Sequence, residues 1–194
     1  MINFKKQIII SVALIGFLFS QDTEPIIDLE EESNIRIGYG IDAEVLVPIF
    51  TTSAGYMYFP IETKKIMIEP LFAYSHSKEE SESLGESSET DLIAIIGLFA
   101  KSQKTEKIKS YAGIRIGMAV EKEKSIYTTN EYTTKAFLIA PTVGAEYFIS
   151  ESFSFGGEWA IRFANGEKKD QVDNLVEEVS GAMLYPNLIF RYYF

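Results

Sequence analysis

Residues 108–121 read IKSYAGIRIGMAVE and contain the pattern that decides the fold. Apolar and polar side chains alternate here, with Ile114 and Ile116 on one side and Arg115 on the other. Successive side chains of a β-strand point to opposite faces of a sheet, so the alternation predicts a strand with one apolar face. The same period of two dominates from Asn34 onward, with almost no helical periodicity. The sequence therefore predicts an all-β protein.

Further alternating segments are found along the chain at 35–45, 66–77, 136–148, 153–163 and 187–194. Two more strands are expected near 55–61 and 91–100, but both are apolar on both faces, so the sequence does not say which side chains share a face. The predicted connectors are alternately long and short, at 47–53, 62–65, 78–90, 101–107, 122–134, 149–152 and 165–182. This rhythm predicts a closed eight-stranded antiparallel up-and-down transmembrane β-barrel over residues 34–194.

The first twenty residues have the layout of a secretory signal peptide. Lys5 and Lys6 precede an apolar run from Ile8 to Phe19, and Ser20 follows at a plausible cleavage point. The apolar run is shorter than the roughly 20 residues that a membrane-spanning helix needs, so cleavage near Ser20 is favoured over anchoring. Residues 21–33 are acidic and aperiodic, which predicts a flexible leader.

The composition limits the classes of function. The net charge of −10 disfavours nucleic acid as a partner, because a phosphate backbone requires a basic surface. The chain has no cysteine, so no disulfide is expected. Phosphate-binding loops, dinucleotide-binding glycine patterns and zinc-ligand spacings are missing from the sequence, and we therefore predict no cofactor, no metal ligand and no catalytic residue.

Two classes of barrel fit the alternation. A soluble periplasmic ligand-binding barrel has its apolar side chains inside, whereas an outer-membrane barrel has them against lipid and its charges in the lumen. We call the side chains on one face of a strand a lane. All four arginines lie in the middle of predicted strands, in polar lanes, while the mature chain's lysines lie in connectors or at strand ends. A closed lumen favours arginine, whose planar guanidinium satisfies several acceptors at once. We therefore favour the outer-membrane barrel and predict a lumen ion-pair network of Arg36, Asp42, Glu44, Glu69, Arg115, Glu146, Glu158, Arg162 and Arg191.

The final segment NLIFRYYF places Phe190, Tyr192 and Phe194 in one lane. This lane resembles the terminal signature of bacterial outer-membrane proteins, and the layout resembles the small eight-stranded barrels such as the OmpA membrane domain, OmpX and the OmpW-like proteins. The resemblance implies recognition of these three residues by the barrel-insertion machinery. It also implies the outer membrane of a Gram-negative cell as location, membrane lipid and lipopolysaccharide as partners, and a monomer.

The expected function is a structural or surface-interaction role, with a porin-like barrel plugged by arginine–carboxylate pairs. The first alternative is a narrow conduit for small apolar molecules, as in the OmpW-like proteins, which an apolar inner lane near 92–100 would favour. A lipid A-modifying enzyme is a further alternative because of His76, but the deacylase pattern has a serine two positions after the histidine and Lys78 stands there. We therefore predict that the protein is not an enzyme.

Two charged regions allow more than one interpretation. The carboxylates between 77 and 91 can gather divalent cations, which prefer oxygen ligands, but their spacing matches no defined loop and a solvated surface loop is expected: Glu79, Glu80, Glu82, Glu86, Glu89 and Asp91. The short connectors are basic and would either meet anionic headgroups or keep the turns hydrated: Lys64, Lys65, Lys101, Lys104 and Lys107.

Overall fold

The computed structural model describes residues 35–42, 56–81, 85–124, 131–170 and 175–194. The predicted signal peptide, the acidic leader and the connector at 47–53 lie outside these residues. Among the described residues, no helix is long and apolar enough to cross a membrane. The strands are β1 (Arg36–Asp42), β2 (Met57–Tyr58), β3 (Ile61–Glu62), β4 (Ile66–Ser81), β5 (Gly85–Gln103), β6 (Ile108–Lys124), β7 (Glu131–Phe148), β8 (Phe153–Asp170) and β9 (Val176–Tyr193).

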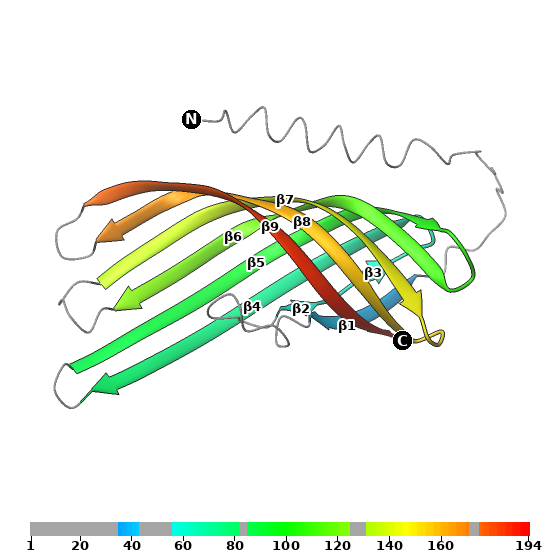
Figure 1. The fold of residues 1–194 in the computed structure, drawn as a ribbon, viewed down its shortest axis with the longest axis horizontal. Coiled ribbons are helices and arrows are strands. Elements are labelled where there is room, and N and C mark those ends of the chain that lie inside the picture. The colour runs from blue at the N-terminus through cyan, green and yellow to red at the C-terminus, as the bar shows by residue number, and fades with distance from the viewer. Residues whose placement is uncertain (1–34, 43–55, 82–84, 125–130, 171–174) are drawn as a thin grey trace.

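The strands form one antiparallel sheet that closes on itself (Figure 1). Neighbouring strands pair in chain order from β4 to β9, and β1 pairs with β9 over Gly38 to Asp42. β2 and β3 both lie between β1 and β4 and are separated only by Phe59 and Pro60, so together they fill one position in the ring. The ring therefore has eight strand positions, and the prediction of a closed eight-stranded antiparallel barrel is confirmed.

Short turns connect the strands at one end of the barrel, at 63–65, 104–107 and 149–152. Each turn contains a hydroxyl side chain that accepts a hydrogen bond from a backbone N–H, which is the local signal that threonine and serine supply in turns. The three bonds run from Ile66 to Thr63 (3.1 Å), from Ile108 to Thr105 (3.0 Å) and from Phe153 to Ser150 (3.1 Å).

At the opposite end, the strands continue far into the predicted long connectors. β4 extends to Ser81, β5 begins at Gly85 and β9 begins at Val176, so the predictions of loops at 78–90, 122–134 and 165–182 were wrong for most of their residues. These segments are polar on both faces, which hides the alternation, but the hydrogen bonds between neighbouring strands need no apolar face. β5 has 19 residues, or roughly 60 Å of strand, against an apolar band of about 25 Å in membrane barrels. The hairpins are therefore much longer than such a band requires.

The barrel is apolar outside, and its buried charges lie within. Tyr74, Met118 and Trp159 are 65%, 56% and 57% exposed, whereas Glu69 is 0% and Arg191 is 1% exposed. The predicted outward lanes are exposed at Ile35, Ile37, Tyr39, Ile41, Ile66, Ile68, Phe72, Ile116, Phe137, Tyr147, Phe155 and Ile161. Phe163 and Ala112, in the same predicted lanes, are buried, at 2% and 5%. Exposed aliphatic and aromatic side chains around a closed ring are the surface that a bilayer requires.

The structure also settles the two strands whose lanes the sequence left unassigned. Met57, Phe59 and Ile61 are exposed, and the residues between them face the lumen. On β5, the exposed lane holds Leu92, Ala94, Ile96 and Leu98, while the inner lane holds Ile93, Ile95, Gly97, Phe99 and Lys101. The inner lane of β5 is therefore largely apolar.

Candidate functional site

Glu69 is the centre of a buried ion network in the lumen. Its carboxylate accepts hydrogen bonds from Arg115 on β6, at 2.5 Å, and from Arg191 on β9. All three side chains are at most 6% exposed. Glu69 therefore joins two cations that come from different sides of the ring.

Each of these arginines has a second carboxylate partner. Arg115 donates to Glu158 on β8 through both terminal nitrogens, one of them at 2.8 Å. Arg191 donates to Glu146 on β7. Planar guanidinium groups suit such paired acceptors, and charge-assisted bonds of this kind are the strong ones. The network thus crosses the lumen and ties together five strands, β4, β6, β7, β8 and β9.

Hydroxyl groups donate further hydrogen bonds to these carboxylates. Tyr111 donates to Glu158 at 3.0 Å, and Glu146 accepts from Tyr193 at 3.1 Å and from Ser154 at 2.9 Å. These donors matter because buried charge is stable only when its lone pairs are also bonded. The network holds three carboxylates against two guanidinium groups, so the three hydroxyl donors stabilise the excess negative charge.

A glycine makes room for one of these hydroxyl donors. Gly144 on β7 is paired with Tyr111 on β6, and a Cβ at Gly144 would lie 2.4 Å from the tyrosine ring. Any larger residue at position 144 would therefore displace the Tyr111 ring and its bond to Glu158.

A second ionic layer lies at the short-turn end. Glu62, 1% exposed, pairs with Lys101 and has Arg36 at 3.6 Å and Lys109 at 3.7 Å. Arg36 also lies over the ring of Tyr193, 4.4 Å from its centroid. This layer has three cations around one carboxylate, so it is positive where the central network is negative.

An apolar layer lies on the other side of the central network. Its buried residues are Tyr56, Tyr58, Leu71, Ala73, Ile95 and Leu138, and Ile93, Ala119, Ala136, Ala164 and Tyr185 pack against them. Arg162 lies here: it donates to the hydroxyl of Tyr56 at 3.1 Å and stacks 4.4 Å from the ring centroid of Tyr185. No carboxylate among the described residues pairs with Arg162, so its charge is held by aromatic rings.

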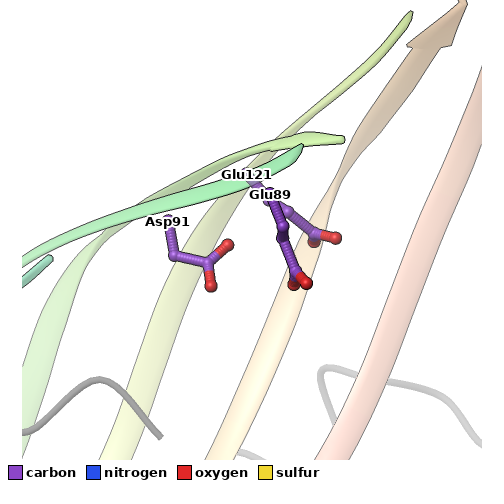
Figure 2. Close-up of side chains that lie close together, drawn as sticks. All are labelled: Glu89, Asp91 and Glu121. Atoms are coloured by element: carbon purple, nitrogen blue, oxygen red, sulfur yellow. The ribbon is translucent and has the colours of Figure 1, made fainter. Parts of the chain in front are cut away.

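The outer mouth of the lumen is acidic. Glu89 and Asp91 on β5 and Glu121 on β6 point toward one another, with one carboxylate oxygen from each within 4.8 Å of the others (Figure 2). Burial raises the pKa of Glu89 and of Glu121, and the neighbouring carboxylates raise both further. Ser75 donates to Asp91 at 2.9 Å. Of the six carboxylates singled out in the sequence, Glu89 and Asp91 belong to this group and Glu79 and Glu86 do not, while Glu82 and the side chain of Glu80 lie outside the described part of the chain.

The structure brings five predicted network residues together: Glu69, Arg115, Glu146, Glu158 and Arg191. It places Arg36 in the Glu62 layer and Arg162 among tyrosines. Glu44 and the side chain of Asp42 lie outside the described residues.

Sequence reasoning missed Glu62 and Lys101, which it placed in short connectors. Lys101 is 9% exposed, so the expectation that it hydrates a turn or meets headgroups was wrong. The sequence did contain a signal for Lys101. It follows Gly97 and Phe99 at steps of two, so all three side chains share one face of β5.

Two other predicted features lie at the surface. His76 is exposed, with its Nδ1 atom 2.9 Å from the hydroxyl of Thr90. In the terminal lane, Tyr192 and Phe194 are exposed and Phe190 is half-buried, all on the outer face of the barrel.

No protein-family model matches this chain, and neither does any curated protein. Several solved structures are similar to it in fold, among them the following three. A major outer membrane protein from Thermus thermophilus is 11% identical and matches over 84% of this chain and 100% of its own, with a TM-score of 0.48. CarO from Acinetobacter baumannii is 8% identical over 84% and 99%, with a TM-score of 0.41. The outer membrane protease OmpT from Escherichia coli is 14% identical over 73% and 64%, with a TM-score of 0.37.

The architecture of the chain is that of an outer-membrane β-barrel. Its own geometry carries this conclusion: the ring is closed, its outer surface is apolar, and its charged side chains pair inside. A soluble ligand-binding barrel would have the opposite polarity.

Proposed function

We propose that the protein is an integral outer-membrane barrel with a structural or surface-interaction role and a lumen closed by arginine–carboxylate pairs. The observation that carries the proposal is the buried Glu69–Arg115–Arg191 network beneath a lipid-type apolar surface. The short turns then face the periplasm and the long hairpins face outward, as in other membrane barrels. These hairpins are the part available for contact with partners outside the cell.

Cell fractionation tests the location. The protein should appear in the outer-membrane fraction and should migrate faster on a gel when it is not boiled, because a folded barrel resists detergent. Protease added to whole cells should cut only in the long hairpins. Recovery in the soluble periplasmic fraction would overturn the proposal.

Planar-bilayer recording tests the closed lumen. The central network leaves both guanidinium groups engaged across a barrel whose interior is just wide enough for side chains to fill. We expect no stable conductance of porin size from the wild-type protein. A large, stable conductance that disappears when the protein unfolds would contradict the plug.

A second function, a narrow conduit for small apolar molecules, is favoured by the apolar inner lane of β5. Ile93, Ile95 and Leu138 belong to an apolar layer that leads from the outer mouth toward the central network. The test is uptake of a small hydrocarbon by cells that do or do not produce the protein. Faster uptake that Ile95→Glu abolishes would support the conduit over the purely structural role.

We also propose that the protein has no lipid A-modifying activity, that it is a monomer, and that the insertion machinery recognises its last strand. His76 is exposed, and its one hydrogen-bonding partner among the described side chains is Thr90. A nucleophilic site needs a serine activated by an oriented base, and this pairing does not provide one. Lipid A incubated with the purified protein should stay unmodified, both for the wild type and for His76→Ala.

A further inference from the structure

Beyond the apolar band, β6 has its acids and its lysines on opposite faces. In the sequence EKEK at 121–124, Glu121 belongs to the acidic lumen mouth, and Glu123 pairs with Lys168 at 3.3 Å. Since strand side chains alternate between faces, Lys122 and Lys124 project from the opposite, outer face. A chain of net charge −10 thus places lysines on the outer surface of β6 just beyond the lipid-facing band.

These lysines line a groove of about 530 Å³ on β5, β6 and β7. The groove is lined by Ser88, Thr90, Val120, Lys122, Glu123, Lys124, Glu131, Tyr132, Thr133 and Lys135. The register places Lys122 between Thr90 on one neighbouring strand and Thr133 on the other. The groove therefore combines ammonium groups with flanking hydroxyls, the donors that bind a phosphorylated sugar.

The three groove lysines have no ion pair within the part of the chain that the structure describes. Elsewhere in the hairpins, Lys78 pairs with Glu86 at 3.2 Å and Lys168 pairs with Glu123. Glu123 is already engaged by Lys168. The outward acids Glu131 and Glu167 lie opposite Lys124 and Lys135 in the register, so two carboxylates face the three lysines and do not cancel their charge. The groove thus keeps a positive charge that suits an anionic ligand.

The groove is continuous with the lipid-facing surface. Val120, at its lower edge, is paired with exposed Leu92 on β5 and with Lys135 on β7. Met118 and Phe137, one rung further toward the short-turn end, are paired and are 56% and 47% exposed. A lipid whose acyl chains lie along Met118 and Phe137 would hold its headgroup against the lysines.

We propose that this groove binds the phosphorylated sugar headgroup of lipopolysaccharide in the outer leaflet. The inference rests on the proposed outer-membrane location, which puts the long hairpins on the outer side. Lipopolysaccharide is favoured over a glycerophospholipid because the lysines are spread over two strands and accompanied by hydroxyls, and its sugar headgroup carries phosphates and hydroxyls at several points. Lys122, Lys124 and Lys135 bind the phosphates, and Thr90 and Thr133 bind sugar oxygens.

The test compares full-chain protein in neutral detergent micelles with a K122Q/K124Q/K135Q variant. Native mass spectrometry and titration would measure binding of short-chain lipopolysaccharide, with phosphatidylglycerol titrated in parallel. Removing one lysine near an anionic surface weakens the binding affinity several-fold, so the loss of three should weaken binding about 100-fold. The matched control replaces three lysines of the short turns, K64Q/K65Q/K107Q, and should bind lipopolysaccharide as the wild type does.

Three results would overturn the proposal. The triple variant could bind lipopolysaccharide as tightly as the wild type, the control could lose binding equally, or phosphatidylglycerol could bind as tightly as lipopolysaccharide through the same lysines. Heat-modifiable migration reports whether each variant is folded, and the single variant K135E provides a second measurement if the triple variant does not fold. Fractionation to the outer membrane is scored separately, so a failure here leaves the proposed location standing.

Discussion

Arg191 on β9 donates a hydrogen bond to Glu69 on β4, although the two residues are 122 positions apart in the chain. Their strands are separated in the ring by β1 and by the position that β2 and β3 share, so the pair reaches across the lumen. Arg115 approaches the same carboxylate from β6. The first and last parts of the barrel are therefore joined through Glu69, and this bond can form only when the ring closes.

Replacing Glu69 by glutamine should destabilise the barrel strongly. The amide has one acceptor oxygen where two guanidinium groups need a carboxylate, and breaking a buried pair on one side costs about 3–5 kcal/mol. Urea titration of the refolded protein, followed by heat-modifiable migration, should show a clearly lower midpoint. The matched control is Glu79→Gln, an exposed position on the same strand, which should change little. Equal midpoints for the two variants would argue against a stabilising network.

A charged residue on the outward face of β6 should impair folding of the barrel into lipid. Ile116 lies near the middle of the outward lane that extends from Ile108 to Val120, and it is 37% exposed. Arginine at a lipid-facing midplane position costs about 2–4 kcal/mol. Ile116→Arg should therefore fold less completely in lipid vesicles, whereas Ser180→Arg, on the polar hairpin of β9, should fold normally. If both variants assemble equally well, the apolar surface is not in contact with lipid.

The sequence predicted the faces of the strands better than it predicted the partners inside. Ile114 and Arg115 could be assigned because alternation alone decides which side chains share a face. Pairing also depends on height along the barrel axis, which the stagger of the strands determines. For that reason, Arg162 was grouped with the other arginines, although it lies among Tyr56 and Tyr185 in the apolar layer.

Strand ends were the other weak point. The β4–β5 hairpin continues to Ser81 and resumes at Gly85, in a segment whose glutamates and serines are typical of loops by composition. Composition predicts what water can solvate, and both a loop and a two-sided polar hairpin meet that condition. Backbone hydrogen bonds to the neighbouring strand make this segment a hairpin rather than a loop, and they produce no pattern of apolar and polar residues in the sequence.

The acidic mouth should make stability depend on pH. Burial, Asp91 and Glu89 raise the pKa of Glu121 above its ordinary value of 4.5, so the folded protein binds this proton more tightly than the unfolded chain does. The favourable contribution of Glu121 to the free energy of unfolding is complete below pH 4.5 and is lost as the pH rises through the raised pKa. Glu121→Gln should therefore raise the melting temperature by about 1–2 °C at about pH 8 and leave it unchanged at about pH 4.

A neighbouring position in the same lane is the control for this effect. Glu123 pairs with Lys168 and also repels Glu121 and Glu89, so Glu123→Gln removes an attraction together with a repulsion. It should therefore stabilise the barrel less than Glu121→Gln does under the alkaline condition. Thermal unfolding of both variants at the two pH values separates these cases. If Glu121→Gln raises the melting temperature equally at both pH values, the cause is packing and the charge argument is contradicted.

Substitution of Phe194 should affect assembly in cells more than stability. The side chain is 76% exposed on the outer face of the barrel, so it contributes little packing inside. Its backbone N–H donates to the carbonyl of Ile37 at 3.0 Å, a bond that any residue other than proline retains. If the insertion machinery recognises the lane of Phe190, Tyr192 and Phe194, then Phe194→Ser should lower the amount in the outer membrane several-fold. The purified variant should still refold in micelles with a nearly unchanged melting temperature. Comparable loss in cells and in the refolding assay would mean that Phe194 acts through stability rather than recognition.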